Sequence, residues 1–296
     1  MRQGECAILK CRADYAYGSN ATPGNGIPPG ATLTFEVELL GSGPKKKERW
    51  EMSPEECLIE DGLLFTVAIH GGAGVISKDM PPEDYYAALG RIVTNAKLFC
   101  EQSLSNLNIG AVDVVEFVVR ELEDEPLFNA GRGAVFTNQE THELEASIMD
   151  GETLKCGATM LLSTVKNPVS LARRVMSDTP HICLAGSGAQ SFAIKCGLET
   201  VDPNYFSTEK RRNQLKTAQQ MDMIANDHDI KTEKDKATGT VGCVCMFKGH
   251  VAAATTTGGL TNKYAGRIGD TAIIGAGSII YNGETNLMST CILKLI

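Results

Sequence analysis

The sequence lacks the features that tie a protein to a membrane or to nucleic acid. No apolar run in its 296 residues approaches the roughly 20 residues that cross a bilayer. The opening residues, MRQGECAILK, lack the apolar core of a secretory signal. Basic residues are outnumbered, 28 Lys and Arg against 36 Asp and Glu, and the formal net charge of −8 disfavours nucleic acid and anionic membranes as partners. We therefore expect a cytoplasmic protein.

Cofactor and redox motifs are absent as well. The ten cysteines include no CxxC pair and no metal-ligand spacing, which is typical of reduced, mostly buried thiols. No GxGxxG stretch occurs, and HGGAG at residues 70–74 is by itself a weak phosphate-loop signal. The sequence therefore predicts no cofactor.

The rest of the composition is that of a globular protein, with 43% hydrophobic and 22% charged residues. Residues 1–40 alternate like two strands around a turn-rich loop, which is too little to bury a core. Residues 41–61 have the composition of a linker. Residues 62–239 combine strands and helices, and residues 240–296 open with a predicted hairpin of buried strands.

The helical segments favour an α+β fold. In GAVDVVEFVVREL, four apolar side chains fall on one face at helical spacing: Val112, Val115, Val119 and Leu122. Residues 82–104 and 168–176 are further predicted helices. Strands cluster first, then helices, then strands again, which indicates helices layered on sheets rather than a strictly alternating parallel sheet.

A change of character marks residues 236–244, KATGTVGCV, where a polar, linker-like segment meets an apolar one. A threonine hydroxyl is a weak nucleophile unless a base takes its proton. If Thr240 became an N-terminus, its own α-amine, with a pKa near about 7.7–8.0, would be that base. In an uncut chain this nitrogen is an amide, so the chemistry requires cleavage between Gly239 and Thr240. The alternative is that Thr240 only begins a strand and Gly239 only turns the chain.

Seven motifs in order extend this hypothesis: AIHGGAG, PLFNAGRGAVFT, ELEASIMDG, VKNPVSLARRVM, GTVGCV, TTTGGLTNK and GRIGDT. Together they resemble the plant-type L-asparaginase and isoaspartyl peptidase family of N-terminal-nucleophile hydrolases, over about residues 62–282. The resemblance implies a four-layer αββα sandwich. It also implies an inactive precursor that cuts itself before a threonine and then hydrolyses L-asparagine or β-aspartyl dipeptides, its small-molecule substrates. A homodimer of cleaved subunits is implied too, with residues 62–239 as the first subunit and 240–296 as the second.

The resemblance assigns roles to single residues. Thr240 becomes the nucleophile, the Gly239–Thr240 bond the self-cleavage site, and Thr257 a second active-site hydroxyl; alone, Thr257 would be a threonine in a strand. The stretch Arg267, Ile268, Gly269 and Asp270 becomes the substrate site. A guanidinium there would pair with the substrate α-carboxylate, and a carboxylate with its α-ammonium. An Arg and an Asp three residues apart are otherwise usually a surface pair.

Three further features are assigned in the same way. Asn129 is expected on the oxyanion side of the site, although NAG is otherwise a plain turn. His70, more often a satisfied core histidine, receives no catalytic role. The family's sodium loop implies a structural ion bound by backbone carbonyls, which leave no side-chain signature, at Leu122, Glu123, Glu125, Phe128, Ala130 and Arg132.

Two departures from the family pattern stand out. The family continues past GAGxYA into an ATGxGE segment that supplies an oxyanion donor, whereas this sequence reads GAGSIIYNGETNLMSTCILKLI from residue 275 and contains no ATGxGE. We therefore expect a truncated second subunit, an incomplete sandwich and little hydrolase activity, because loss of one oxyanion donor costs on the order of 10²–10³ in rate.

The other departure is at the N-terminus. DYAYGSNATPGNGIPPGATLTFEVELL resembles the C-terminal part of an FK506-binding-protein peptidyl-prolyl isomerase domain. Three hypotheses follow: an autoprocessing asparaginase or isoaspartyl peptidase, a catalytically inactive fusion or gene-model product, and an immunophilin-like binding fragment.

Overall fold

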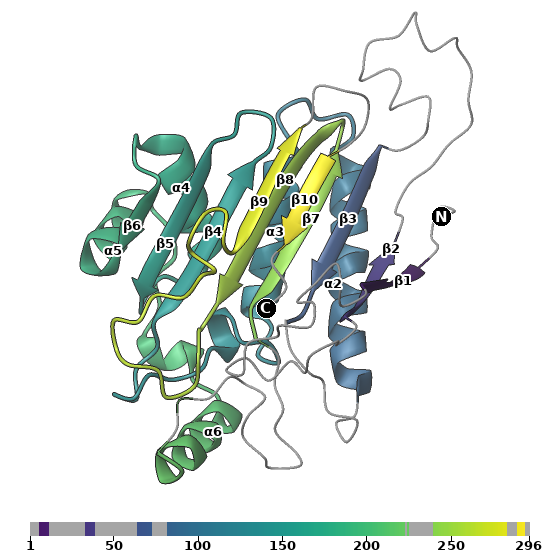
Figure 1. Cartoon of the computed structure of the whole chain (residues 1–296). Coiled ribbons are helices and arrows are strands. Elements are labelled where there is room, and N and C mark those ends of the chain that lie inside the picture. Colours follow the sequence, from purple (N-terminus) through teal and green to yellow (C-terminus); the bar gives the residue numbers. More distant parts are fainter. Residues whose placement is uncertain are drawn as a thin grey trace, which may run out of the picture.

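The computed structural model describes residues 6–11, 33–38, 64–72, 82–222, 224, 239–282 and 289–293. The predicted linker, residues 41–61, lies outside these ranges. Mixed α and β elements make up the fold (Figure 1), as the sequence predicts. Within the described residues, no helix is both long and apolar enough to cross a membrane.

An eight-stranded sheet forms the centre of the molecule, in the order β1-β2-β3-β7-β8-β4-β5-β6. All neighbouring strands run antiparallel except β5 and β6. The strands are β1 (Cys6–Cys11), β2 (Leu33–Glu38), β3 (Phe65–His70), β4 (Leu144–Asp150), β5 (Cys156–Leu162), β6 (Cys183–Ala185), β7 (Val241–Phe247) and β8 (His250–Thr257). The two strands predicted in residues 1–40 are thus confirmed as an antiparallel pair, and within the described residues the register pair Glu38↔Val67 joins them to β3.

Helices cover one face of this sheet. They are α2 (Pro82–Ser103), α3 (Ala111–Asp124) and α4 (Pro168–Asp178), with α5 (Gly186–Lys195) beside β5 and β6. On α3 the fully buried apolar residues are Val114, Val115, Val118, Val119 and Leu122. The predicted face is therefore confirmed except at Val112, which is only partly buried at the margin of this core. The valines fit here because β-branched side chains fill the layer between helix and sheet without losing further rotamer freedom.

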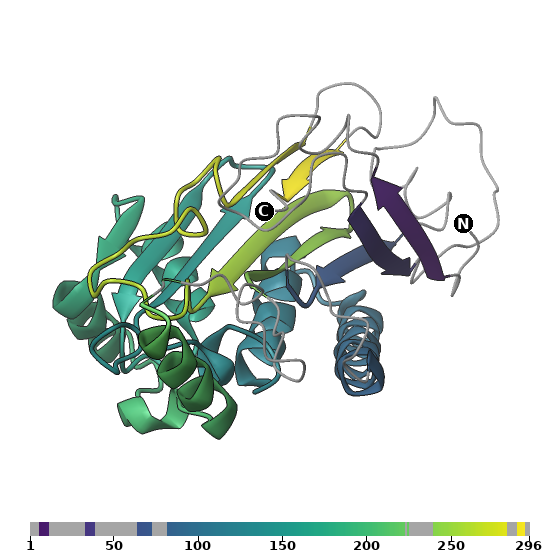
Figure 2. The same cartoon turned by 60° about the horizontal axis from the view of Figure 1, so that its bottom comes forward.

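The opposite face of the sheet carries a second, two-stranded sheet of β9 (Ser278–Asn282) and β10 (Ser289–Leu293). Ile280 of β9 packs into a small apolar cluster with Met149, Val251 and Ala253 of the large sheet. In Figure 2 the yellow strands lie on one side of the sheet and the blue and teal helices on the other. The described residues therefore form three layers: helices, large sheet and small sheet.

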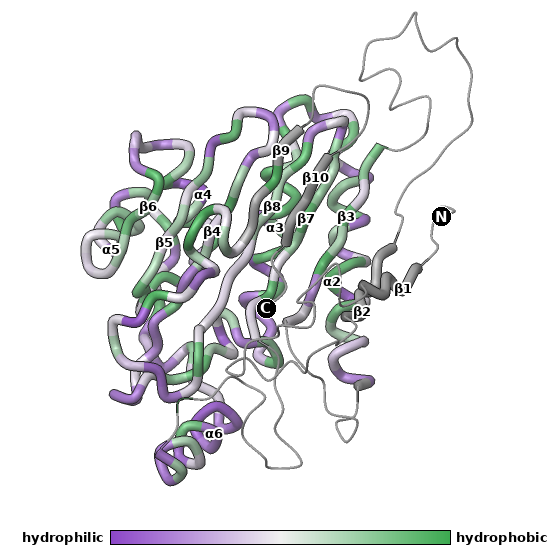
Figure 3. The backbone as a smooth tube through the Cα atoms, in the orientation of Figure 1, coloured by the Kyte–Doolittle hydropathy of each residue, from purple (hydrophilic) through white to green (hydrophobic). Residues whose placement is uncertain are grey.

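The chain between residue 203 and the junction is partly helical, which corrects the expectation of a linker-like segment before Thr240. It contains η4 (Pro203–Phe206) and α6 (Glu209–Gln220), and α6 is among the most hydrophilic elements in Figure 3. Thr208 caps α6 by accepting from the Arg211 N–H. Leu215 and Ala218 are buried, and the buried Arg211 donates from Nε to the Gly133 carbonyl. Tertiary contacts thus hold a helix whose sequence is almost wholly polar.

Candidate active site

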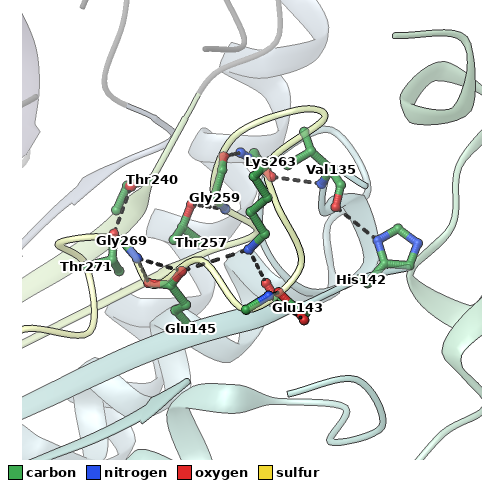
Figure 4. A network of polar contacts seen from close by, with 12 residues as sticks. Val135, His142, Glu143, Glu145, Thr240, Thr257, Gly259, Lys263, Gly269 and Thr271 are labelled. Carbon is green, nitrogen blue, oxygen red and sulfur yellow. Dashed lines mark hydrogen bonds and ion pairs between the residues drawn. The ribbon is translucent and has the colours of Figure 1, made fainter. Parts of the chain in front are cut away.

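Thr240 lies at the point where the chain enters β7. Gly239 and Thr240 are both half-buried. The Thr240 hydroxyl makes a hydrogen bond of 3.0 Å to the hydroxyl of Thr271, as Figure 4 shows. Thr271 is buried and directly follows the predicted substrate-binding stretch. The predicted nucleophile therefore has a hydroxyl partner, but one that the sequence did not suggest.

Thr257 lies beside the same point, at the end of β8. The register pair Val241↔Thr256 brings the start of β7 and the end of β8 together. The Thr257 hydroxyl is buried and accepts a hydrogen bond of 3.0 Å from the Gly259 N–H. The two predicted catalytic threonines are thus neighbours, while in this uncut chain Thr257 bonds to its own loop.

Asn129 anchors the glycines that follow Thr257. Its side chain is fully buried; Nδ2 donates to the Gly259 carbonyl over 2.8 Å, and Oδ1 accepts from the Val135 N–H over 3.0 Å. Its backbone carbonyl accepts from the Gly258 N–H. A Cβ at position 258 would lie 2.5 Å from Asn129 Oδ1, so only glycine fits there. Asn129 is therefore more than a turn residue, because it fixes the loop after β8.

The predicted substrate stretch surrounds a buried carboxylate. Both oxygens of Glu145, on β4, accept from the Gly269 N–H at 2.9 Å. Arg267 folds back over this turn, since a Cβ at Gly269 would lie 3.1 Å from Arg267 Nη1, and one at Gly259 3.3 Å. Arg267 and Asp270 are half-buried and Ile268 is exposed. The structure thus brings the four predicted substrate residues to the loop after Thr257.

A buried lysine completes this network. Lys263 donates from Nζ to the Glu143 carbonyl over 2.7 Å and lies 3.9 Å from Glu145 Oε1. Neither Lys263 nor Glu145 is exposed. Burial raises the pKa of Glu145 against the opposing effect of Lys263, and burial lowers the pKa of Lys263 against the opposing effect of Glu145. Each group is the other's main charge partner, as Figure 4 shows.

Comparisons with known proteins show which family this chain belongs to. Residues 63–290 match the protein family described as asparaginase, which is more than half of the chain. The chain belongs to the asparaginase family. It is 45% identical over 230 residues to an isoaspartyl peptidase of Escherichia coli, covering 76% of this chain and 70% of that protein.

Relatives of this asparaginase-family chain occur in other lineages. It is 45% identical over 234 residues to a probable isoaspartyl peptidase/L-asparaginase 2 of Arabidopsis thaliana, covering 72% of this chain and 71% of that protein. Against a plant-type L-asparaginase of Pyrococcus furiosus the identity is 38% over 224 residues, covering 73% and 70%. Residues 1–40 match a different family, the FKBP-type peptidyl-prolyl cis-trans isomerases. This second match is as short as the segment recognised in the sequence.

His70 of the asparaginase-family region lies against the strand that Thr240 begins. It pairs in register with Gly242, and a Cβ at position 242 would lie 2.7 Å from His70 Nε2. Neither ring nitrogen has a hydrogen-bonding partner among the described residues, and burial lowers the pKa of His70 to about 4. His70 is thus a neutral, buried histidine, but its polar atoms are not satisfied as those of a core histidine usually are.

The loop predicted to bind sodium draws backbone carbonyls together. A Cβ at Gly131 would lie 2.2 Å from the Glu123 carbonyl oxygen, and one at Gly133 would lie 2.1 Å from that of Phe128. Two of the predicted carbonyls also accept backbone hydrogen bonds, Glu125 from Phe128 N–H and Ala130 from Gly133 N–H. Carbonyl oxygens are ligands that hard cations accept, and a sodium ion at this loop stays a prediction. Among the described residues, no group of three or more His, Cys, Asp or Glu could hold a metal.

The sequence did not reveal the buried residues that contact the predicted site residues and their loop. Thr271, Glu145 and Lys263 all lie inside the quoted motifs, yet none was assigned a role. Glu145 carried a usable signal, because a carboxylate among apolar neighbours in a strand is almost never buried without a partner. Thr271 and Lys263 carried none, since their partners lie 31 and 120 residues away in the chain.

Proposed function

We propose that this chain is an autoprocessing amidohydrolase that hydrolyses L-asparagine or β-aspartyl dipeptides through an N-terminal Thr240. The observation that carries the proposal is the position of the Thr240 hydroxyl. It lies half-buried, next to Thr257 and to the loop of Arg267, in a chain whose relatives are named isoaspartyl peptidases and L-asparaginases.

Self-cleavage comes first in the proposed sequence of steps. Thr240 Oγ attacks the carbonyl carbon of Gly239, its proton passes to the departing amide nitrogen, and the C–N bond breaks to leave an ester. The Thr240 α-amine is free once this C–N bond breaks, and water then hydrolyses the ester, which releases the Gly239 carboxylate and regenerates the Thr240 hydroxyl. The half-buried position of both residues suits this reaction, because the surrounding protein holds the attacking hydroxyl and the departing nitrogen in a fixed arrangement.

Substrate hydrolysis then uses the new amine. It takes the Oγ proton as Oγ attacks the side-chain amide of the substrate. The proton passes to the leaving nitrogen, which departs as ammonia from asparagine or as an amino acid from a β-aspartyl dipeptide. Water releases L-aspartate from the acyl ester. Arg267 would hold the substrate α-carboxylate by its planar fork, Asp270 the α-ammonium, and Asn129 would lie on the oxyanion side.

The same proposal extends to assembly. Cleavage would make residues 62–239 and 240–296 two subunits, held together by β7 between β3 and β8, and we expect a homodimer of such pairs. The small sheet of β9 and β10 covers the face where a second sheet of a four-layer sandwich would pack. A sodium ion on the carbonyls of residues 122–132 would stiffen the loop that carries Asn129.

A cleavage assay tests the proposal. Purified chain should convert into two fragments, the second beginning at Thr240 by N-terminal sequencing and intact mass. Thr240→Ala should stay a single chain, while Thr240→Ser, which keeps a hydroxyl, should still cut. Cleaved protein should release ammonia from L-asparagine or leucine from β-aspartyl-leucine, at the low rate that the sequence predicts. An uncut wild-type chain would favour the inactive-fusion hypothesis, and a fragment starting elsewhere would exclude Thr240.

A further inference from the structure

The partner of the Thr240 hydroxyl is unusually well fixed for a loop residue. Thr271 is 1% exposed. Its carbonyl accepts from Ser147 Oγ over 2.7 Å and from Thr255 Oγ1 over 3.4 Å. The loop also closes tightly, because a Cβ at Gly277 would lie 2.5 Å from this carbonyl. The backbone of Thr271 is therefore anchored to two strands of the large sheet, β4 and β8.

The number of hydroxyl hydrogens decides which group donates in each hydrogen bond around the Thr271 carbonyl. Ser147 has one hydroxyl hydrogen, and its shortest contact is the 2.7 Å bond to the Thr271 carbonyl. In the 3.0 Å contact between Ser147 and Thr255, Thr255 is then the donor, so that its 3.4 Å contact with the Thr271 carbonyl shares the same hydrogen and is the weaker of the two. The chain of hydroxyls ends on the Thr271 carbonyl, which leaves the Thr271 side chain free to meet Thr240.

In the uncut chain the nucleophile has no base of its own. The nitrogen of Thr240 is an amide until the bond to Gly239 breaks, so it cannot accept a proton. The other predicted hydroxyl, that of Thr257, accepts from the Gly259 N–H, and no hydrogen bond joins it to Thr240 within the described residues. The 3.0 Å bond to Thr271 is the contact that sets the direction of the Thr240 hydroxyl.

We propose that Thr271 is a positioning residue for self-cleavage, holding the Thr240 hydroxyl in one rotamer in the uncut chain. This inference rests on the proposed self-cleavage and deepens it. In this role Thr240 would donate to Thr271, which leaves the lone pairs of Thr240 Oγ for attack on the Gly239 carbonyl carbon. Once cleavage frees the α-amine, that amine is the base, and Thr271 then only holds the rotamer of the Thr240 side chain.

The test is the rate of self-cleavage in Thr271→Val, which removes the hydroxyl and keeps the branched shape. Loss of one oriented hydrogen bond should slow cleavage about tenfold. Thr271→Ser should restore the rate to within about threefold, because the hydroxyl returns. The matched control is Thr159→Val on β5, an equally buried threonine of the large sheet whose hydroxyl bonds to the Pro168 carbonyl; it should cut at the wild-type rate.

Hydroxylamine separates the two steps, because it captures the ester that the attack forms. If Thr271 positions the attack, Thr271→Val should be slow with and without hydroxylamine; full rescue would place its effect on ester hydrolysis and overturn the proposal. Equal rates for wild type and Thr271→Val would overturn the positioning role of Thr271 and leave the proposed function standing. An uncut wild-type chain would overturn the proposed function and this inference with it. Equal slowing in Thr159→Val would reduce Thr271 to a packing residue.

Discussion

At the scale of single residues, the site depends on charges that no water reaches. Glu145 and Lys263 are both fully buried, 3.9 Å apart, and each makes further hydrogen bonds to backbone. A buried ion pair is weak evidence for stability by itself, but removal of one partner leaves an uncompensated buried charge. The effect of the pair on the free energy of unfolding is therefore measured by removing one partner.

Glu145→Gln should destabilise the chain by about 3 kcal/mol. The amide still accepts one bond from the Gly269 N–H, but Lys263 loses its charge partner. Urea unfolding should be measured in the Thr240→Ala background, so that every variant stays one chain. Adding Lys263→Met should recover most of the loss, because no buried charge then remains. A cost for Glu145→Gln below about 1 kcal/mol would mean that water reaches Lys263.

At the scale of elements, α3 and α4 are joined by a second buried carboxylate. Glu123 lies at the end of α3, and its Oε1 accepts from the Val169 N–H at the start of α4 over 3.1 Å. Its Oε2 has no partner among the described residues. Burial raises the pKa of Glu123 to about 8, although the neighbouring donors Thr256 and Val169, in that order, oppose the rise. The folded chain therefore holds a proton on Glu123 that the unfolded chain releases near its ordinary pKa of 4.5.

This shift predicts how stability depends on pH. Between pH 4.5 and about 8 the folded state binds more protons at Glu123 than the unfolded state, so this residue's contribution to stability falls as pH rises through that range. Glu123→Gln cannot ionise and should lack the fall. Urea unfolding at pH 5 and pH 8.5 should therefore show wild type losing more stability than the variant. Parallel losses would mean that Glu123 titrates normally.

The elements also mark where sequence reasoning works. The α3 face was predictable, because valines at helical spacing leave few other ways to bury them. The helix α6 was not, because it buries Arg211 and Gln214 beside Leu215, and a pattern that counts only apolar residues reads this as a linker. The site divides in the same way: motifs predicted the residues on the loops, while contacts such as Glu145 to Gly269, 124 residues apart, depend on strand register.

At the scale of the whole molecule, the N-terminal strands are the least integrated part of the large sheet. β2 meets β3 through the single register pair Glu38↔Val67, whereas β3 pairs with β7 over six residues, Phe65–His70. The match to the asparaginase family begins at residue 63. Pairing energy in a sheet accumulates pair by pair, so the fold that holds Thr240 should depend on β3 and little on β1 and β2.

A chain that starts at residue 62 should therefore fold and cut itself before Thr240 at the full-length rate, within about twofold. A chain that starts at residue 73 should not, because it lacks β3, and β7 would become an edge with unpaired backbone groups. Loss of β3 also removes the buried Phe65 and Val67 from the core shared with α2 and α3. Time courses of cleavage and thermal unfolding of both chains test this, with Thr240→Ala versions as uncut references. Slow cleavage or a lower melting temperature in the chain that starts at residue 62, compared with the full-length chain, would mean that residues 1–61 are part of the asparaginase-family fold and not an addition to it.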